Sequence, residues 1–495
     1  MDWSVGEKML SSLVKQTALR SAVLIVGKCI GLAGRVGLSR ILGAEGIGLY
    51  QMAYSFFGLI LMTISGGVPT ALALFTAKQP NRGWRALQLL SVYTIVIGLV
   101  LSYWMHNHAG DIAAFVGNHE LIWAIRALSP ALIAVPLLQL ARGYMQGVRS
   151  YEAISVSELT EQALRIAILI ILISLHASQG IGYAVGMGLY GTTIAAIGAF
   201  LVLTIFAITS KQSTMMIIYS PMNKVGLGIM LRTSVIIGGT RMLVPFSDFI
   251  DSLLIPHRLQ VAGHSLSESI AMYGIITGMA AVIVYMPTMI TAAISHTVTM
   301  KIAANYEEGK QSRRDIEKVL RFVWTWGIIS GLFIFIYAEE AAGLIFGVKE
   351  AAEPIRYLSA IPLIVGLREF TTSILWAQER KHTPLFGLVI GICISVLLQY
   401  IVIAIPGFGY TGASIGILLL EAIATLWNLR ALHNTGCTLF SFKWVGLDLP
   451  FFCCVMLLFV PPLLQGEQHL VTIVLTAVFF WICASLLIGM RYRNK

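Results

Sequence analysis

Long apolar segments follow one another along almost the entire chain. A helix that crosses a bilayer needs ~20 mostly apolar residues, and about fourteen segments of this 495-residue chain meet that requirement. The segments that we expect to be spans are 18–40, 49–77, 86–106, 121–146, 154–176, 181–208, 228–253, 270–299, 318–338, 354–377, 384–405, 410–430, 446–465 and 468–490. In lipid every backbone N–H and C=O must be satisfied within the protein, so segments of this length are helices. The sequence therefore predicts an all-α polytopic membrane protein.

The composition agrees with this prediction. The chain is 57% hydrophobic and 12% charged, whereas a soluble domain is roughly 45–50% apolar and about 25% charged. A net charge of +10 would point to nucleic acid in a soluble protein. In a membrane protein, Lys and Arg instead collect in the cytoplasmic loops, so we expect no nucleic-acid partner.

The basic residues of the loops also predict the orientation. If the N-terminus is cytoplasmic, nearly all the loop Lys and Arg lie on the inside, and the outside loops hold little beyond Arg258 and Lys349. This is the asymmetry that the positive-inside rule describes. We therefore expect a multi-pass protein of the cytoplasmic membrane with both termini in the cytoplasm.

Three pairs of short motifs indicate an internal repeat. GIGY at 180–183 matches GFGY at 407–410, and a Pro-Thr pair occurs at Pro69 and again at Pro287. The third pair is residues 126–147, which resemble residues 356–380. The members of each pair lie about 220–230 residues apart and in the same order. With an even number of spans in each half, such a repeat is parallel.

The repeat predicts the domain organisation. We expect two six-helix bundles, residues 1–220 and 221–435, around a central cavity, with an additional helix pair at 436–495. Transporters built from such repeats place the substrate site between the halves, near the bilayer midplane.

The first span carries charges where a bilayer disfavours them. Lys28 and Arg35 are seven residues apart, about two turns, and so share a helix face. A cation at the bilayer centre costs ~2.5–3.5 kcal/mol on insertion scales. Two interpretations remain open: an ion pair with an acid on a neighbouring helix, or a water-filled cavity lined by cations. Gly31 and Gly34 on the same helix would permit close helix packing or bending.

The seventh span is also charged. Arg241 and Asp248 share a face at a spacing of seven, Asp251 follows one turn later, and Pro245 lies between the cation and the acids. Proline removes a backbone hydrogen bond, so we expect Pro245 to kink or loosen this helix. Either Arg241 and Asp248 form an internal pair without a role in transport, or Arg241 faces the cavity while an Asp tunes its charge or binds a cation.

Other charges within spans are of lower rank as site candidates. Glu158, Glu161 and Arg165 have the spacing of a local pairing network, which we interpret as structural. Glu421 in the twelfth span stands isolated in the sequence and is a further candidate for tuning the cavity or binding an ion. No Cys or His cluster has the spacing of a metal site, so we expect no metal and no cofactor beyond coupling to Na⁺, H⁺ or the membrane potential.

Clustered cations in a membrane cavity suit an anionic ligand. Lys and Arg bind pyrophosphate through charge-assisted hydrogen bonds. A lipid diphosphate that carries sugars fits this setting, because its headgroup needs a polar cavity while its tail stays in lipid. A cationic drug would be repelled by the same cavity.

Four motifs resemble the stage V sporulation protein B group. They are the run from Gly27 to Ala73, ARGYMQG at 141–147, FIDSLLIPHRLQ at 249–260 and MYGIITGMA at 272–280. That group belongs to the polysaccharide-export branch of the multidrug/oligosaccharidyl-lipid/polysaccharide flippase superfamily. The resemblance implies two bundles, a central cavity and alternating access, and a relation to lipid II flippases, which use basic residues of the first helix. Lys28 lies where such a residue is expected, and Gly34 stands where the group's pattern has a further Arg.

These observations lead to a flippase as the expected function, not an enzyme. Its cargo would be an undecaprenyl-pyrophosphate-linked sugar, bound by Lys28, Arg35 and Arg241, and we expect a monomer that works near the enzymes of envelope synthesis. The alternatives are an ion-coupled multidrug exporter, a membrane-embedded glycosyl or acyl transferase, and an envelope scaffold. A transferase would need acidic metal ligands or a nucleophile in a substantial loop, and the loops around 106–120, 209–225 and 301–317 are short and lack such a set.

Overall fold

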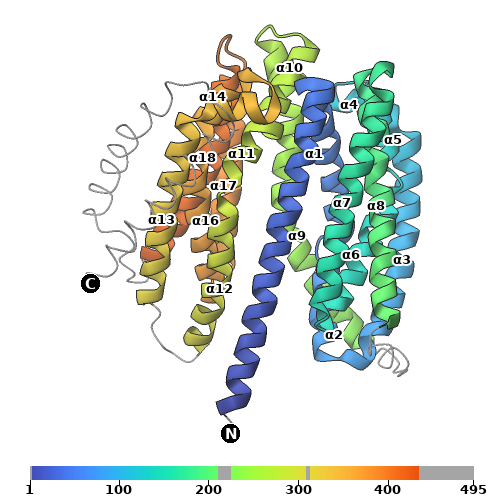
Figure 1. Ribbon diagram of the computed structural model, residues 1–495, viewed down its shortest axis with the longest axis vertical. Helices are drawn as coiled ribbons and strands as arrows, with labels where there is room; N and C mark the ends of the chain where they lie inside the picture. Colours follow the sequence, from blue (N-terminus) through green and yellow to red (C-terminus); the bar gives the residue numbers. More distant parts are fainter. Residues whose placement is uncertain (1–2, 210–223, 308–312, 434–495) are drawn as a thin grey trace. The chain divides into compact units, whose positions relative to one another are not determined.

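The computed structural model describes the backbone of residues 3–209, 224–307 and 313–433, and these residues form helices and no strand (Figure 1). Eight of the described helical segments are long and apolar enough to cross a membrane, or nine if the bent pair Leu121–Leu128 and Ala131–Gly147 is one span. The predicted all-α polytopic fold is therefore confirmed. The total of fourteen stays a prediction, because the last two expected spans, in 446–490, lie outside the described residues.

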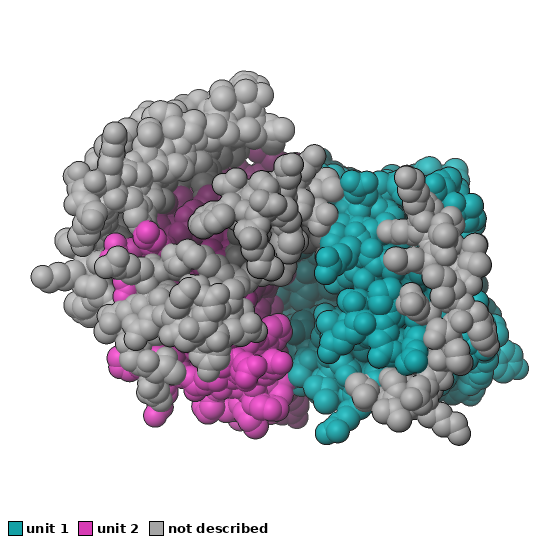
Figure 2. Space-filling view, turned by 90° about the horizontal axis from the view of Figure 1, so that it is seen from below, with its two compact units in different colours: residues 1–278, 404–407 teal, residues 279–403, 408–495 magenta. Residues whose placement is uncertain are grey.

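The helices group into two compact units, which Figure 2 shows in different colours. One comprises residues 1–278 with 404–407, and the other comprises residues 279–403 with 408–495. The first unit thus extends well beyond residue 220. The predicted bundles at 1–220 and 221–435 stay a prediction, and the expected helix pair at 436–495 lies outside the described part of the chain.

The first unit contains the N-terminal helices and continues to the middle of a π-helical segment. Its elements are α1 (Trp3–Ser65), α2 (Val68–Lys78), α3 (Pro80–Asn107), α4 (Ala109–Val116), α5 (Leu121–Leu128), α6 (Ala131–Gly147), α7 (Tyr151–His176), the 3₁₀ turn η1 (Ala177–Gln179), α8 (Ile181–Thr209), α9 (Lys224–Val261), α10 (Leu266–Tyr273) and the π-helix η3 (Gly274–Ala280).

The second unit begins within η3. Its further elements are α11 (Ala281–Tyr285), α12 (Thr288–Glu307), α13 (Arg313–Ile336), α14 (Ala338–Ala341), the π-helix η4 (Ala342–Phe346), the 3₁₀ turn η5 (Lys349–Ala351), α15 (Ala352–Tyr357), the 3₁₀ turn η6 (Leu358–Ala360), α16 (Ile361–Ala377), α17 (His382–Val402) and α18 (Gly409–His433). In both units a short helix, a longer helix and a pair of long helices follow one another: α5 to α8 in the first unit and α15 to α18 in the second.

Helix α1 is two helical segments joined at Gly43. Gly43 has φ 69° and ψ −165°, a conformation that is essentially restricted to glycine. In Figure 1 the first segment runs from the N-terminus to the other end of the unit, while α2, which follows α1, lies back near the starting end. The chain therefore reverses at Gly43. The first segment corresponds to the predicted span 18–40, and the second segment together with α2 corresponds to the predicted span 49–77.

Each unit has its own apolar core. In the first, Leu72, Leu90 and Leu140 are buried among α2, α3 and α6. In the second, Val323 of α13 and Phe370 of α16 are fully buried. Helices α7 and α9 match the predicted spans 154–176 and 228–253 in position. They are absent from the eight apolar spans, and both carry the interior charges described below.

Candidate functional site

A ridge of glycines on α1 lets α7 approach closely. A side chain at Gly34 would collide with Ile166 of α7, and one at Gly37 would collide with Ile170. Gly31 differs, because a side-chain carbon there would meet no atom within 4 Å. Gly34 thus has a packing function in this structure, and α1 stays helical through both Gly31 and Gly34. Their predicted bending during transport stays a prediction.

Arg35 lies beside this ridge and is half-buried. Its guanidinium donates a hydrogen bond of 3.4 Å to the backbone carbonyl of Gly278, in the π-helix η3. No ion pair within the described part of the chain includes Arg35. The sequence left two interpretations open, an ion pair with a neighbouring acid or a cavity lined by cations. For Arg35 the described residues do not show the ion pair.

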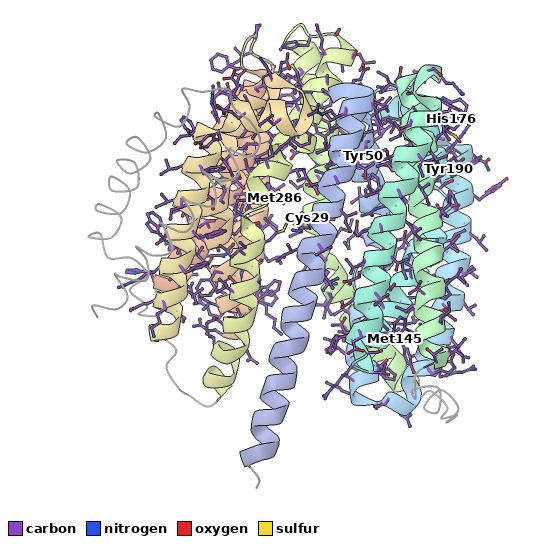
Figure 3. The ribbon with its side chains drawn as sticks, viewed as in Figure 1. Cys29, Tyr50, Met145, His176, Tyr190 and Met286 are labelled. Atoms are coloured by element: carbon purple, nitrogen blue, oxygen red, sulfur yellow. The ribbon has the colours of Figure 1, made fainter. Side chains whose placement is uncertain are left out.

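Two tyrosines of the second α1 segment lie near Arg35. The rings of Tyr50 and Tyr54 are 4.6 Å apart between centroids, and both interact electrostatically with Arg35. The Tyr54 hydroxyl makes a short hydrogen bond of 2.5 Å with the Thr192 hydroxyl of α8. Figure 3 labels Tyr50 on this segment and Cys29 on the first segment, next in sequence to Lys28. Arg35, Tyr50, Tyr54 and Thr192 thus form a polar surface. The sequence did not indicate it, because two tyrosines four residues apart in an apolar segment look like core residues.

Helix α7 supplies a second arginine to this surface. Arg165 interacts electrostatically with Arg35 and with Tyr54. It donates to Gln162 at 2.5 Å and lies 4.0 Å from Glu161. Glu161 is closer to Arg142 of α6, at 2.6 Å. The Glu161–Arg165 part of the predicted local network on α7 is therefore present, and a shorter ion pair joins Glu161 to another helix.

Lys28 and Arg241 occupy other levels of the first unit. Lys28 is exposed and belongs to no ion pair within the described residues. Arg241 of α9 is exposed and donates to the Thr70 hydroxyl at 2.9 Å and to the Gly66 carbonyl at 3.4 Å. Gly66 follows Tyr50 by sixteen residues, about 24 Å at 1.5 Å per residue. The three predicted cations are thus not one cluster but follow one another along the unit.

The acids of α9 lie toward a different neighbour. Arg241 donates to the Gly66 carbonyl and the Thr70 hydroxyl, and an Arg241–Asp248 ion pair, one of the two alternatives, is not among the ion pairs of the described residues. Asp248 is exposed and Asp251 is half-buried, and both interact electrostatically with Tyr273 of α10. Helix α9 runs without a break from Lys224 to Val261 with Pro245 inside it. A role for Pro245 in bending stays a prediction.

Glu421 is not isolated in the folded chain. It is buried in the second unit, where it forms an ion pair with Arg368 of α16 and accepts a hydrogen bond of 3.2 Å from Tyr285. The partners are far apart in the sequence, so local spacing gave no signal of this pair. Within the described residues, no three His, Cys, Asp or Glu side chains are grouped in a way that could hold a metal ion.

Comparisons with known proteins agree with this architecture. The chain is 22% identical over 432 residues to stage V sporulation protein B of Bacillus subtilis (strain 168), which covers 84% of this chain and 83% of that protein. Its fold matches the lipid II flippase MurJ in an inward closed conformation, with a TM-score of 0.74, 14% identity and coverage of 96% of this chain and 98% of that one. It also matches an inward-facing multidrug resistance MATE family transporter of the MOP superfamily, with a TM-score of 0.66, 18% identity and coverage of 83% and 96%.

At the level of the sequence family, residues 13–262 match the polysaccharide biosynthesis protein family. This match includes the glycine ridge of α1, Arg35, Tyr50, Tyr54 and Arg165. Because it spans half of the chain, it is sufficient to assign the family. The chain therefore belongs to the polysaccharide biosynthesis protein family.

Proposed function

We propose that this protein is a flippase for an undecaprenyl-pyrophosphate-linked sugar. The cargo is a lipid II-type peptidoglycan precursor or a related polysaccharide unit, and it moves from the cytoplasmic to the outer leaflet by alternating access. The observation that carries this proposal is Arg35, a cation within a membrane helix whose hydrogen bond goes to a neutral carbonyl. A cation in this position costs free energy unless an anion compensates it. The name of one structural neighbour, a lipid II flippase, and the description of the family, polysaccharide biosynthesis protein, support this cargo.

The predicted cations have a natural use in such a cycle. Lys28 lies seven residues from Arg35 on the first α1 segment, about 10 Å along the helix, and Arg241 lies further along the unit. We infer that the three bind the diphosphate successively as it crosses, rather than all at once. Asp248, Asp251 and Glu421 then tune the charge along the path or bind a coupling cation, either Na⁺ or H⁺. Glu421 is the weaker candidate, because its carboxylate already has a cation in Arg368.

The remaining features complete the proposal. Gly31, Gly34 and Pro245 allow the helices to bend between the inward-open and outward-open states. Besides Na⁺ and H⁺, the membrane potential is a third candidate for the energy source that drives transport. The protein works as a monomer in the cytoplasmic membrane, with both termini in the cytoplasm, near the enzymes of envelope synthesis. It performs transport and no covalent chemistry.

An ion-coupled multidrug exporter is the second candidate function. The fold likeness to a MATE family transporter favours it, and so does the exposure of Asp248 on α9. A binding surface for organic cations must be dominated by acids, whereas Arg35, Arg165 and Lys28 make the described surface around α1 basic. The flippase therefore accounts for more of the site.

A translocation assay tests the two candidates together. The protein is reconstituted in liposomes with labelled lipid II, and exposure of the label in the opposite leaflet is followed with and without Na⁺ and H⁺ gradients. Wild type should translocate, and the double variant Lys28→Ala/Arg35→Ala should not, although it stays folded. Arg126→Ala is the matched control, because this arginine lies over the Trp123 ring of α5 and takes part in none of the site contacts described above. Transport by the double variant at the wild-type rate would refute the site. Failure of wild type with every gradient, combined with binding of organic cations, would favour the exporter.

A further inference from the structure

Arg35 and Arg165 form a pair of cations that the sequence did not indicate. They come from different helices, α1 and α7, and the glycine ridge is what brings these helices together, since Gly34 contacts Ile166, the neighbour of Arg165. The two guanidinium groups interact as like charges. Like charges held together inside a membrane protein raise its free energy, so an anion bound between them would stabilise this arrangement.

The charges around the pair leave it without full compensation. Glu161 forms ion pairs with two arginines. Its carboxylate lies 2.6 Å from Arg142 and 4.0 Å from Arg165, so the contact with Arg142 is the closer one. The Arg142–Glu161 pair is neutral as a unit. Glu161 is thus shared between Arg142 and Arg165, and Arg35 belongs to no ion pair of the described residues, so these ion pairs do not neutralise the charge excess of Arg35 and Arg165.

Arg165 also has an unused hydrogen-bond donor. Its Nε is buried and has no hydrogen-bond partner in the described protein, although about a quarter of the side chain is exposed. A buried donor without a partner costs ~1–3 kcal/mol, and more for a charged group. Guanidinium is a planar fork of donors that matches phosphoryl oxygens. The free donor and the charge excess thus point to the same kind of ligand.

We propose that Arg35 and Arg165 bind the two phosphoryl groups of a lipid diphosphate between α1 and α7, one arginine to each group. The hydroxyls of Tyr50 and Tyr54 lie beside the same groups, and Glu161, held by Arg142, positions Arg165 without neutralising it. This inference rests on the proposed function and deepens it, because it names a recognition element on α7 that is separate from Lys28 and Arg241. It also predicts selectivity, since a lipid monophosphate can engage only one of the two arginines.

The test compares two lipids on the full-length protein. Binding of undecaprenyl diphosphate and of undecaprenyl phosphate is measured by native mass spectrometry on wild type, Arg165→Gln, Arg35→Gln and the control Arg126→Gln. Wild type and the control should prefer the diphosphate. Loss of one charge-assisted contact is worth about a 10–100-fold weaker affinity, so Arg165→Gln should lose this factor for the diphosphate and retain its affinity for the monophosphate.

The possible failures are distinguishable. If wild type prefers the diphosphate and Arg165→Gln keeps that preference unchanged, this inference is overturned and the proposed function stands. If wild type binds neither lipid, the proposed function fails and the inference fails with it. Where Arg165→Gln does not fold, Arg165→Lys keeps the charge but not the fork of donors, and it should still show a reduced preference for the diphosphate; an unreduced preference overturns the inference.

Discussion

The guanidinium of Arg142 lies 2.6 Å from the Glu161 carboxylate, and this contact joins α6 to α7 inside the first unit. Arg142 also donates to the Ser157 hydroxyl at 2.9 Å, which in turn donates to the Ala199 carbonyl of α8. Three helices thus share one polar network. Its stability effect is the first prediction.

Glu161→Gln should destabilise the protein by about 3 kcal/mol, because it leaves Arg142 buried without an acid. We take the lower end of the range for buried pairs, since both side chains retain 13–15% exposure. The double variant Arg142→Met/Glu161→Met should recover most of the loss, because it removes both charges. The free energy of unfolding of wild type, the single variant and the double variant is measured in the same detergent. Glu339→Gln is the control: its pair with Arg356 is 44–60% exposed, so the loss should be below ~1 kcal/mol. An equal loss in both single variants would contradict the prediction.

A matched pair of glycines tests the α1–α7 interface. Gly34→Leu should destabilise the protein by about 1–3 kcal/mol, the usual cost of overpacking, because its side chain meets Ile166. Gly31→Leu should be tolerated, since the space beside Gly31 is open. Both variants replace glycine by leucine in the same helix, three residues apart, so helix propensity cancels in the comparison. Equal melting temperatures would show that α7 does not pack on Gly34 as described.

The reversal at Gly43 leads to a backbone prediction. Gly43→Ala should cost ~1–3 kcal/mol, because alanine does not adopt φ 69° and ψ −165° without strain. Gly58→Ala is the control, since Gly58 is helical and a side chain there meets no neighbour. That change should be neutral or slightly stabilising, as alanine favours helix over glycine. Thermal unfolding of the two variants checks the contrast, and a Gly43→Ala protein as stable as wild type would rule out the reversal.

The strongly apolar helices could be predicted from the sequence, and the contacts between distant helices could not. Span 181–208 was found almost residue for residue as α8 (Ile181–Thr209), because hydropathy over ~20 residues depends only on local composition. Arg35 was found for the same local reason, as a charge within an apolar run. Its neighbour Arg165 was assigned to a structural or interfacial network, because the approach of α1 to α7 depends on which of several glycines faces the partner. Glycines in one long run look alike, which is also why Gly43 was not singled out as the break.

Two native cysteines test whether the first segment of α1 faces water or lipid. Cys29 and Cys393 are both exposed in the structure. Cys29 adjoins Lys28, and a transport path lined by cations requires water at that surface. Cys393 lies on α17, one of the helices that are long and apolar enough to cross a membrane, and we expect it to face lipid. A hydrophilic maleimide reacts with the thiolate, which forms in water and not in lipid. Single-cysteine variants that retain either thiol should therefore differ: the Cys29 protein should be labelled in intact membranes and the Cys393 protein should not. Undecaprenyl diphosphate should slow labelling of Cys29 by occupying the adjacent path. Labelling of Cys393 alone would place the Lys28 face of α1 in lipid, and it would remove Lys28 from the proposed path.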